Sequence, residues 1–115
     1  MQYMLLIHSD EAAMRSAPAE GTARMHAAYM AYTEALHQAG VVVNGNRLRP
    51  TSATTTVRVI DGKTQVLDGP YAETKEQLAG YYLIDVSDLD VALSWAARCP
   101  GAAVGAIEVR PIWTM

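Results

Sequence analysis

The sequence predicts an α+β fold with four main strands and two helices, in the order β-α-β, inserted hairpin, β-α-β. Three observations predict it. Short apolar or β-branched runs recur along the chain, two longer segments between them carry apolar residues every three or four positions, and an Asp-Gly pair joins two of the strand-like runs. This order is the ferredoxin-like βαββαβ arrangement, and 115 residues suit a single domain spanning residues 1–115.

The first half of the chain supplies one strand, one helix and a short second strand. Residues 3–7 are continuously apolar and predict a strand, whereas residues 9–19 are polar and contain proline, so they predict a loop. From Glu20 an apolar stripe with helical spacing runs to Gly40, which ends the helix; its members are Met25, Ala28, Tyr29, Tyr32, Leu36 and Ala39. Residues 41–43 predict a strand that the turn residues 44–46 end almost at once.

The second half predicts a hairpin and a second β-α-β unit. Residues 54–60 and 63–67 read as strands joined by Asp61-Gly62, the strongest short-range hairpin signal. Residues 80–86 form the next strand, and Ser87 is expected to cap the helix that follows. That helix has a predicted inner face of Leu89, Ala92, Leu93 and Ala96 and ends at Pro100-Gly101, before a last strand at 106–112.

Two helices can cover only one face of the sheet, although several strands are apolar on both sides. We therefore expect the other face to pack against the sheet of a second copy, giving a homodimer in which two sheets form a shared barrel. Glu108 and Arg110 lie two apart on the last strand and share one face. They are expected to point into that barrel, either as cross-dimer salt bridges or as substrate contacts.

Composition excludes several classes of function. The formal net charge is −3 and the nine Lys and Arg residues are scattered, so no nucleic-acid footprint is expected. No apolar run reaches the length of a membrane span, and the N-terminus shows no signal peptide. Cys99 is the only cysteine, which allows no intrachain disulfide and favours a buried small hydrophobe. A cytoplasmic protein with no membrane partner is expected.

A charged loop follows the hairpin and is the most informative segment of the chain. Asp68-Gly69-Pro70 is a strong turn signal, because Gly69 permits a positive φ and Pro70 fixes its own. Residues 72–78 then predict one or two helical turns carrying several charges. Such a loop suits a binding site, and equally a solvated connection.

The motif resembles a known family. Residues 68–84, DGPYAETKEQLAGYYLI, are similar to the signature of the DGPF branch of the YCII-related proteins, with Tyr71 where that branch carries Phe. Residues 3–7, 49–55, 92–97 and 108–112 also resemble it, so the match covers nearly the whole chain. The resemblance implies a dimeric α+β barrel in a mostly uncharacterised bacterial family. One related branch has a His–Asp pair proposed as catalytic, and some members are fused to sigma factors.

His26 and Asp68 are the candidate acid–base residues. His26 lies at the shoulder of the helical stripe, where a histidine can transfer protons near neutral pH or simply be a half-exposed boundary residue. Asp68 could orient it, or could accept the amide hydrogen of residue 71 in an Asx turn that shapes the loop. His26 and His37 lie about 16 Å apart along a helix, so they cannot ligate one metal, and neither a metal nor a cofactor is expected.

The remaining candidates are substrate-binding residues. A pocket between the sheet and the helix from Glu20 would be walled by Tyr29, Tyr71 and Tyr81. Lys75 or Arg47 would anchor an anionic group, and Glu73 is the loop carboxylate best placed to act because it directly follows the turn. A solvated short helix is the alternative for these loop charges.

Two hypotheses of function follow. The first is a small cofactor-free enzyme, or a small-molecule-binding protein, that uses His/Asp acid–base chemistry. The second is a regulatory or interaction module without catalysis, as the relatives fused to sigma factors suggest. An enclosed polar cavity at the loop favours the first, and an exposed apolar patch on the helices favours the second.

Overall fold

The computed structural model describes residues 1–114 and confirms the α+β fold. Its main sheet contains β1 (Gln2–Ser9), β2 (Val42–Arg47), β5 (Gln77–Asp85) and β6 (Ala106–Pro111) in the order β2-β5-β1-β6. Every neighbouring pair is antiparallel, so the two β-α-β units interleave as the ferredoxin-like order requires.

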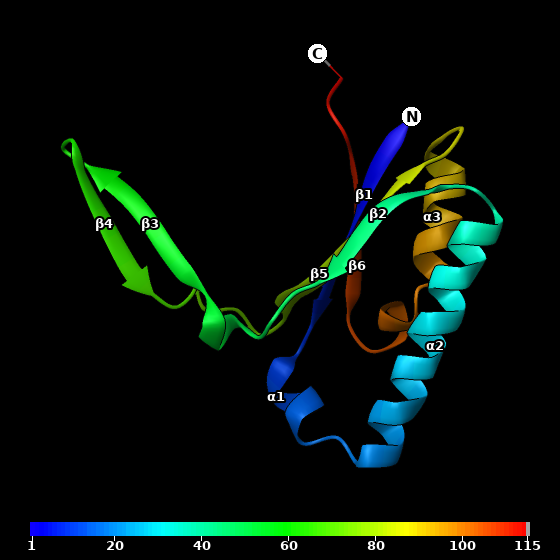
Figure 1. Ribbon diagram of the computed structural model, residues 1–115, viewed down its shortest axis with the longest axis horizontal. Helices are drawn as coiled ribbons and strands as arrows, with labels where there is room; N and C mark the ends of the chain where they lie inside the picture. The colour runs from blue at the N-terminus through cyan, green and yellow to red at the C-terminus, as the bar shows by residue number, and fades with distance from the viewer. Residues whose placement is uncertain (115) are drawn as a thin grey trace.

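Two helices cover one face of this sheet, α2 (Ala19–Gln38) and α3 (Leu89–Arg98) (Figure 1). The core lies between them and the sheet, and Leu5, Leu36, Ile84 and Cys99 are its largest fully buried side chains. Strand alternation sends every second residue of β1 into this core, as the burial of Tyr3, Leu5 and Ile7 shows. Cys99 is buried, as its position in the sequence predicted.

The predicted hairpin is formed by β3 (Thr55–Ile60) and β4 (Lys63–Asp68), which make a separate two-stranded sheet. We call residues Thr55–Asp68 the arm. Asp61 and Gly62 form its turn with φ of 53° and 76°, the paired positive values that an Asp-Gly hairpin turn requires. In Figure 1 the arm projects from the sheet on the side opposite to the helices.

Several predicted boundaries were wrong, first among them the loop at residues 9–19. A short helix, α1 (Glu11–Arg15), forms there because the side chain of Asp10 accepts a hydrogen bond from the amide of Ala13 at 3.1 Å. The predicted turn at 44–46 is part of β2. Gly45 serves close packing instead, since a Cβ there would lie 2.7 Å from the ring of Tyr82.

Two further predictions were wrong in the second half. Residues 72–76 form no helix, because the side chains of Thr74 and Gln77 bond to loop carbonyls at 2.7 and 2.5 Å. The cap of α3 is Asp88, not Ser87, and it accepts from the amide of Val91 at 3.0 Å. The helix is turned so that Leu89 and Leu93 are exposed and Ala92, Trp95 and Ala96 are buried.

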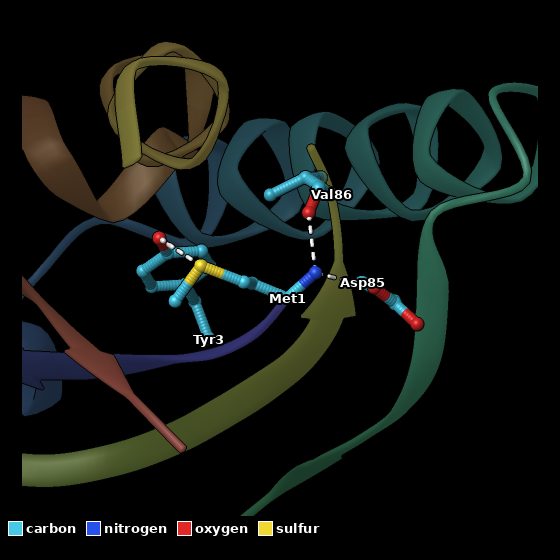
Figure 2. A network of polar contacts seen from close by, with 4 residues as sticks. All are labelled: Met1, Tyr3, Asp85 and Val86. Atoms are coloured by element: carbon cyan, nitrogen blue, oxygen red, sulfur yellow. Dashed lines mark hydrogen bonds and ion pairs between the residues drawn. The ribbon is translucent and has the colours of Figure 1, made fainter. Parts of the chain in front are cut away.

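Polar contacts tie the start of β1 to the end of β5 (Figure 2). The terminal amine of Met1 lies 3.2 Å from Oδ1 of Asp85 and donates to the carbonyl of Val86 at 2.8 Å. Tyr3 donates its hydroxyl to the sulfur of Met1 at 3.6 Å. These contacts are far from the loop that follows β4 and fix the opposite end of the sheet.

Candidate functional site

A cleft of about 530 Å³ opens where α1, the 3-10 helix η1 (Thr51–Ala53) and the loop after β4 meet. We call it the α1–loop cleft. Its walls come from segments far apart in the sequence, and their residues are Asp10, Glu11, Ala12, Arg15, Thr51, Ser52, Gly69, Pro70, Ala72, Glu73, Thr74, Lys75 and Gln77. The charged loop singled out by the sequence is therefore one wall of a concave site, the setting in which small-molecule sites are usually found.

Glu11 holds the three walls together. Its Oε1 accepts from the amide of Thr51 and its Oε2 from the hydroxyl of Thr51, both at 2.9 Å. On the other side, the amide of Glu11 donates to Oε1 of Gln77 at 3.0 Å. Because a carboxylate that accepts two hydrogen bonds makes strong, directional contacts, α1 is fixed against both η1 and the start of β5.

The Asp-Gly-Pro turn ties the cleft to the arm. Gly69 has a φ of 106°, as its place before Pro70 predicted. Its amide donates to the carbonyl of Thr54 at 2.7 Å, and its carbonyl accepts from the hydroxyl of Thr56 at 2.7 Å. The predicted Asx turn is wrong, since no side-chain hydrogen bond of Asp68 occurs within residues 1–114.

Some charged side chains of the cleft bond to other protein groups, and others have no protein partner within residues 1–114. Both carboxylate oxygens of Glu11 accept hydrogen bonds from Thr51, and Asp10 caps α1. Arg15, Lys75 and Glu73 take part in no ion pair within the part of the chain that the structure describes. Two cations and one carboxylate therefore face the cleft without a protein partner, beside the hydroxyls of its threonine and serine walls. This arrangement suits an anionic ligand, since free guanidinium and ammonium groups bind carboxylates and phosphates.

The structure does not bring His26 and Asp68 together within one chain. His26 is exposed on α2 and lines a shallow hollow of about 340 Å³ made by that helix alone, with Tyr29, Met30, Thr33 and Glu34. Asp68 ends β4 at the base of the arm and is exposed. No hydrogen bond or ion pair joins them among residues 1–114.

The predicted tyrosine-walled pocket is wrong. Tyr29 points from α2 toward α3, where its hydroxyl lies 3.7 Å from the sulfur of Cys99. Tyr81 lies on the opposite face of the sheet, because its neighbour Tyr82 is the residue that reaches α2, bonding Thr33 at 2.7 Å. Tyr71 is 79% exposed in the loop and lines neither hollow.

Arg47 and Tyr81 lie outside the α1–loop cleft as well. Arg47 is exposed and pairs with Gly80 in the β2–β5 ladder. The hydroxyl of Tyr81 accepts from the side-chain amide of Asn46 at 2.9 Å. Of the substrate-binding residues predicted from the sequence, the cleft contains Glu73 and Lys75.

Asp10, Glu11 and Arg15 are absent from the site that the sequence predicts, because the polar, proline-containing residues 9–19 predict a loop. The signal was available: Asp10 followed by Glu11 is an N-cap with an acidic first turn, and both favour a helix start. A helix there places Arg15 one turn after Glu11, on the side of the cleft.

Buried hydroxyls and the thiol lie around α2, away from the cleft. Burial raises the pKa of Tyr29 and of Tyr32, and the nearby Cys99 adds to both effects. Burial also raises the pKa of the Cys99 thiol, with a smaller opposing effect from its bond to Tyr29. A thiol held in its protonated form is a poor nucleophile, so this cluster belongs to the core.

The uncovered face of the sheet carries a contact between a histidine and a carboxylate. Ile107 and Val109 pack on the helical core, so Glu108 and Arg110 point the other way. Oε1 of Glu108 lies 2.5 Å from Nε2 of His8 on the neighbouring strand. The two side chains touch without hydrogen-bond alignment, and the His8 nitrogen is shielded from solvent.

Residues 1–114 contain no cluster of three His, Cys, Asp or Glu side chains able to hold a metal ion. Within the same range, no helix has the length and apolar character needed to cross a membrane.

Comparisons with known proteins show the family of the chain. The family model described as "YCII-related domain" matches residues 1–115. The chain is also 40% identical over 114 residues to the uncharacterized protein R00369 of Rhizobium meliloti (strain 1021). The matched region covers 97% of this chain and 92% of that relative. The similarity therefore includes the cleft walls, the arm and both helices.

Proposed function

The chain belongs to the family of YCII-related domain proteins, and from that premise we propose that it binds a small organic anion in the α1–loop cleft of a homodimer. The observation that carries the proposal is the pair of uncommitted cations, Arg15 and Lys75, on two walls of one cleft. Cations without protein counterions in a concave site favour a ligand that brings its own negative charge.

The size and chemistry of the cleft support a small polar ligand. About 530 Å³ lies within the range of small-molecule sites, and an apolar ligand would leave the charged walls unpaired. Glu73 is the free carboxylate in the cleft and is the group available to accept a proton from a bound ligand. Acid–base chemistry, where it occurs, is therefore assigned to Glu73 in preference to a His26–Asp68 pair.

The homodimer part of the proposal is supported by the uncovered face of the sheet. Met4 and Leu6 of β1 and Leu83 of β5 lie on that face and stay partly exposed in one chain. Apolar residues in the centre of a sheet favour packing against another sheet. In a dimer with a two-fold axis, this face of one copy packs against the same face of the other.

Thermal-shift titration with a panel of small mono- and dicarboxylates and phosphate monoesters tests the cleft. A bound ligand at 100 times its dissociation constant adds about 2.7 kcal/mol to the folded state. We expect at least one member of the panel to raise the melting temperature of the wild type, and both Arg15→Gln and Lys75→Gln to remove that shift.

Arg24→Gln is the matched control, because it removes the same charge from an exposed site on α2 outside the cleft. It should respond to the ligand as the wild type does. The proposal fails if no anion stabilises the wild type, or if the stabilising anion acts equally on Arg15→Gln and Lys75→Gln.

A further inference from the structure

The arm exposes apolar side chains on both of its faces, Ile60 and Leu67 on one and three valines on the other. The β3–β4 register places Val57 opposite Val66, with Val59 two residues along the same face. Their exposed fractions are 59%, 61% and 67%. We call these three residues the valine face. A two-stranded hairpin is only marginally stable in water, so an apolar face of this kind favours an arm that packs against something else.

The arm points toward the uncovered face of the sheet. In Figure 1 the helices lie on one side of the sheet and the arm extends away on the other. The chain is consequently flat and extended, with a radius of gyration of 16.1 Å and extents of 48 × 45 × 18 Å. A compact chain of this length has a radius of about 13 Å. The sheet and the arm thus form two sides of an open angle.

The exposed area of the chain matches what a dimer needs to bury. The accessible surface is 8181 Å², whereas a compact monomer of 12.4 kDa has about 6,100 Å². The excess is roughly 2,000 Å², and a stable interface needs about 800 Å² from each partner. The excess accessible surface of one chain is therefore large enough to form an interface with a second copy.

We propose that the arm is a dimerisation arm, whose valine face packs on a second copy beside the sheet-to-sheet contact, while the partner's arm does the same in return. The inference rests on the homodimer part of the proposed function and adds the element that grips the partner. The two-fold symmetry makes each contact occur twice, so three valines in each arm contribute six buried side chains.

The arm also connects this interface to the α1–loop cleft. Thr51–Ala53 leads into β3 and Gly69 follows β4, and both segments are cleft walls. The bonds from Gly69 to Thr54 and Thr56 join the two roots of the arm. An arm held by a second copy therefore holds two walls of the cleft in place.

Sedimentation velocity over a dilution series tests the arm. The triple variant Val57→Thr/Val59→Thr/Val66→Thr keeps the shape and β-propensity of the side chains but makes the face polar. We expect the wild type to be a dimer at micromolar concentration and the triple variant to raise the dimer dissociation constant by roughly a hundredfold or more. The control Val104→Thr changes an exposed valine outside both the arm and the main sheet and should leave the constant unchanged.

Circular dichroism checks that the variants fold, since the arm contributes no residue to the buried core. Should the triple variant misfold, a second variant with residues 55–68 replaced by a short Gly-Ser link is measured in the same way, with the same expectation. A wild-type dimer that persists unchanged in the arm variants overturns the arm and leaves the sheet-face dimer standing. A wild type that is monomeric overturns both the arm and the sheet-face dimer. Ligand binding in the cleft is tested separately by Arg15→Gln and Lys75→Gln.

Discussion

The two faces of the main sheet carry similar residues but differ in what covers them. On the helical side, Tyr3, Leu5 and Ile7 of β1 are buried beneath α2 and α3. On the other side, Met4 and Leu6 of the same strand remain partly exposed. The sequence of β1 is apolar on both faces, so the difference comes from the number of helices and not from the residues of the strand. One chain thus builds a complete core on one face only, and the predictions below test how far the two halves differ.

The largest effect is expected in the helical core. Leu36 of α2 is fully buried, so Leu36→Ala leaves a cavity and should lower the free energy of unfolding by about 2–5 kcal/mol. Met30→Ala on the same helix removes a residue that is 63% exposed and should cost less than about 0.5 kcal/mol. Denaturant unfolding at one fixed protein concentration measures both. Equal losses would show that α2 is not the cover of the core.

A smaller and more local effect is expected at the cleft. Glu11→Ala removes both acceptors of Thr51, and hydrogen bonds to a charged group contribute about 1.5–3 kcal/mol. The amide of Thr51 should then exchange its hydrogen at least about tenfold faster, while the core amides of β1 stay protected. Glu11→Gln keeps an acceptor for that amide and is the matched control. Unchanged exchange at Thr51 in Glu11→Ala would mean that Glu11 does not hold the cleft walls.

The smallest effect at neutral pH is expected for Tyr32→Phe. The hydroxyl of Tyr32 donates to the buried carbonyl of Trp95 at 2.7 Å, and its loss should cost about 1 kcal/mol. Burial raises the pKa of Tyr32 above its ordinary value of 10.0, so the folded state keeps the proton that the unfolded chain loses. Stability is therefore full below about pH 10 and falls as the pH rises further.

Tyr32→Phe removes one of the hydroxyls whose ionisation destabilises the fold at high pH. The stability of this variant should therefore fall less steeply above about pH 10 than that of the wild type. Urea unfolding at several pH values measures the two slopes. Tyr71→Phe changes an exposed tyrosine and should follow the wild-type curve. A steeper decline in Tyr32→Phe than in the wild type would contradict the buried state of this hydroxyl.

Most of the fold was predictable because its signals are local. The apolar stripe of α2 and the Asp-Gly pair of the arm each specify their element within a few residues. The errors arose where a tertiary contact decides the local structure. Gly45 looks like a turn residue, but the ring of Tyr82 explains it, and that ring lies far away in the sequence. The start of α3 depends on which of two adjacent residues caps it, and Asp88 is the one whose side chain reaches the amide of Val91.

The candidate site was predictable only in part. The loop itself was found, with Glu73 and Lys75, because turn residues and charges are visible in the sequence. The opposite wall was not, since the bond from Glu11 to Thr51 joins residues 40 apart, and a single sequence gives no sign of that pairing. Tyr29 and Tyr81 were assigned to one wall because a helix stripe and a strand do not reveal which side of the sheet each residue faces.

The arm also has a consequence for the newly made chain. β3 and β4 each have one unpaired edge, and such edges can recruit strands from other molecules into aggregates before the proper partner is met. Arg58 and Lys63 lie on the arm's second face and Asp61 at its tip, and charges at these places discourage indiscriminate strand addition. These charges thus oppose aggregation through the edges of the arm while its valines stay exposed.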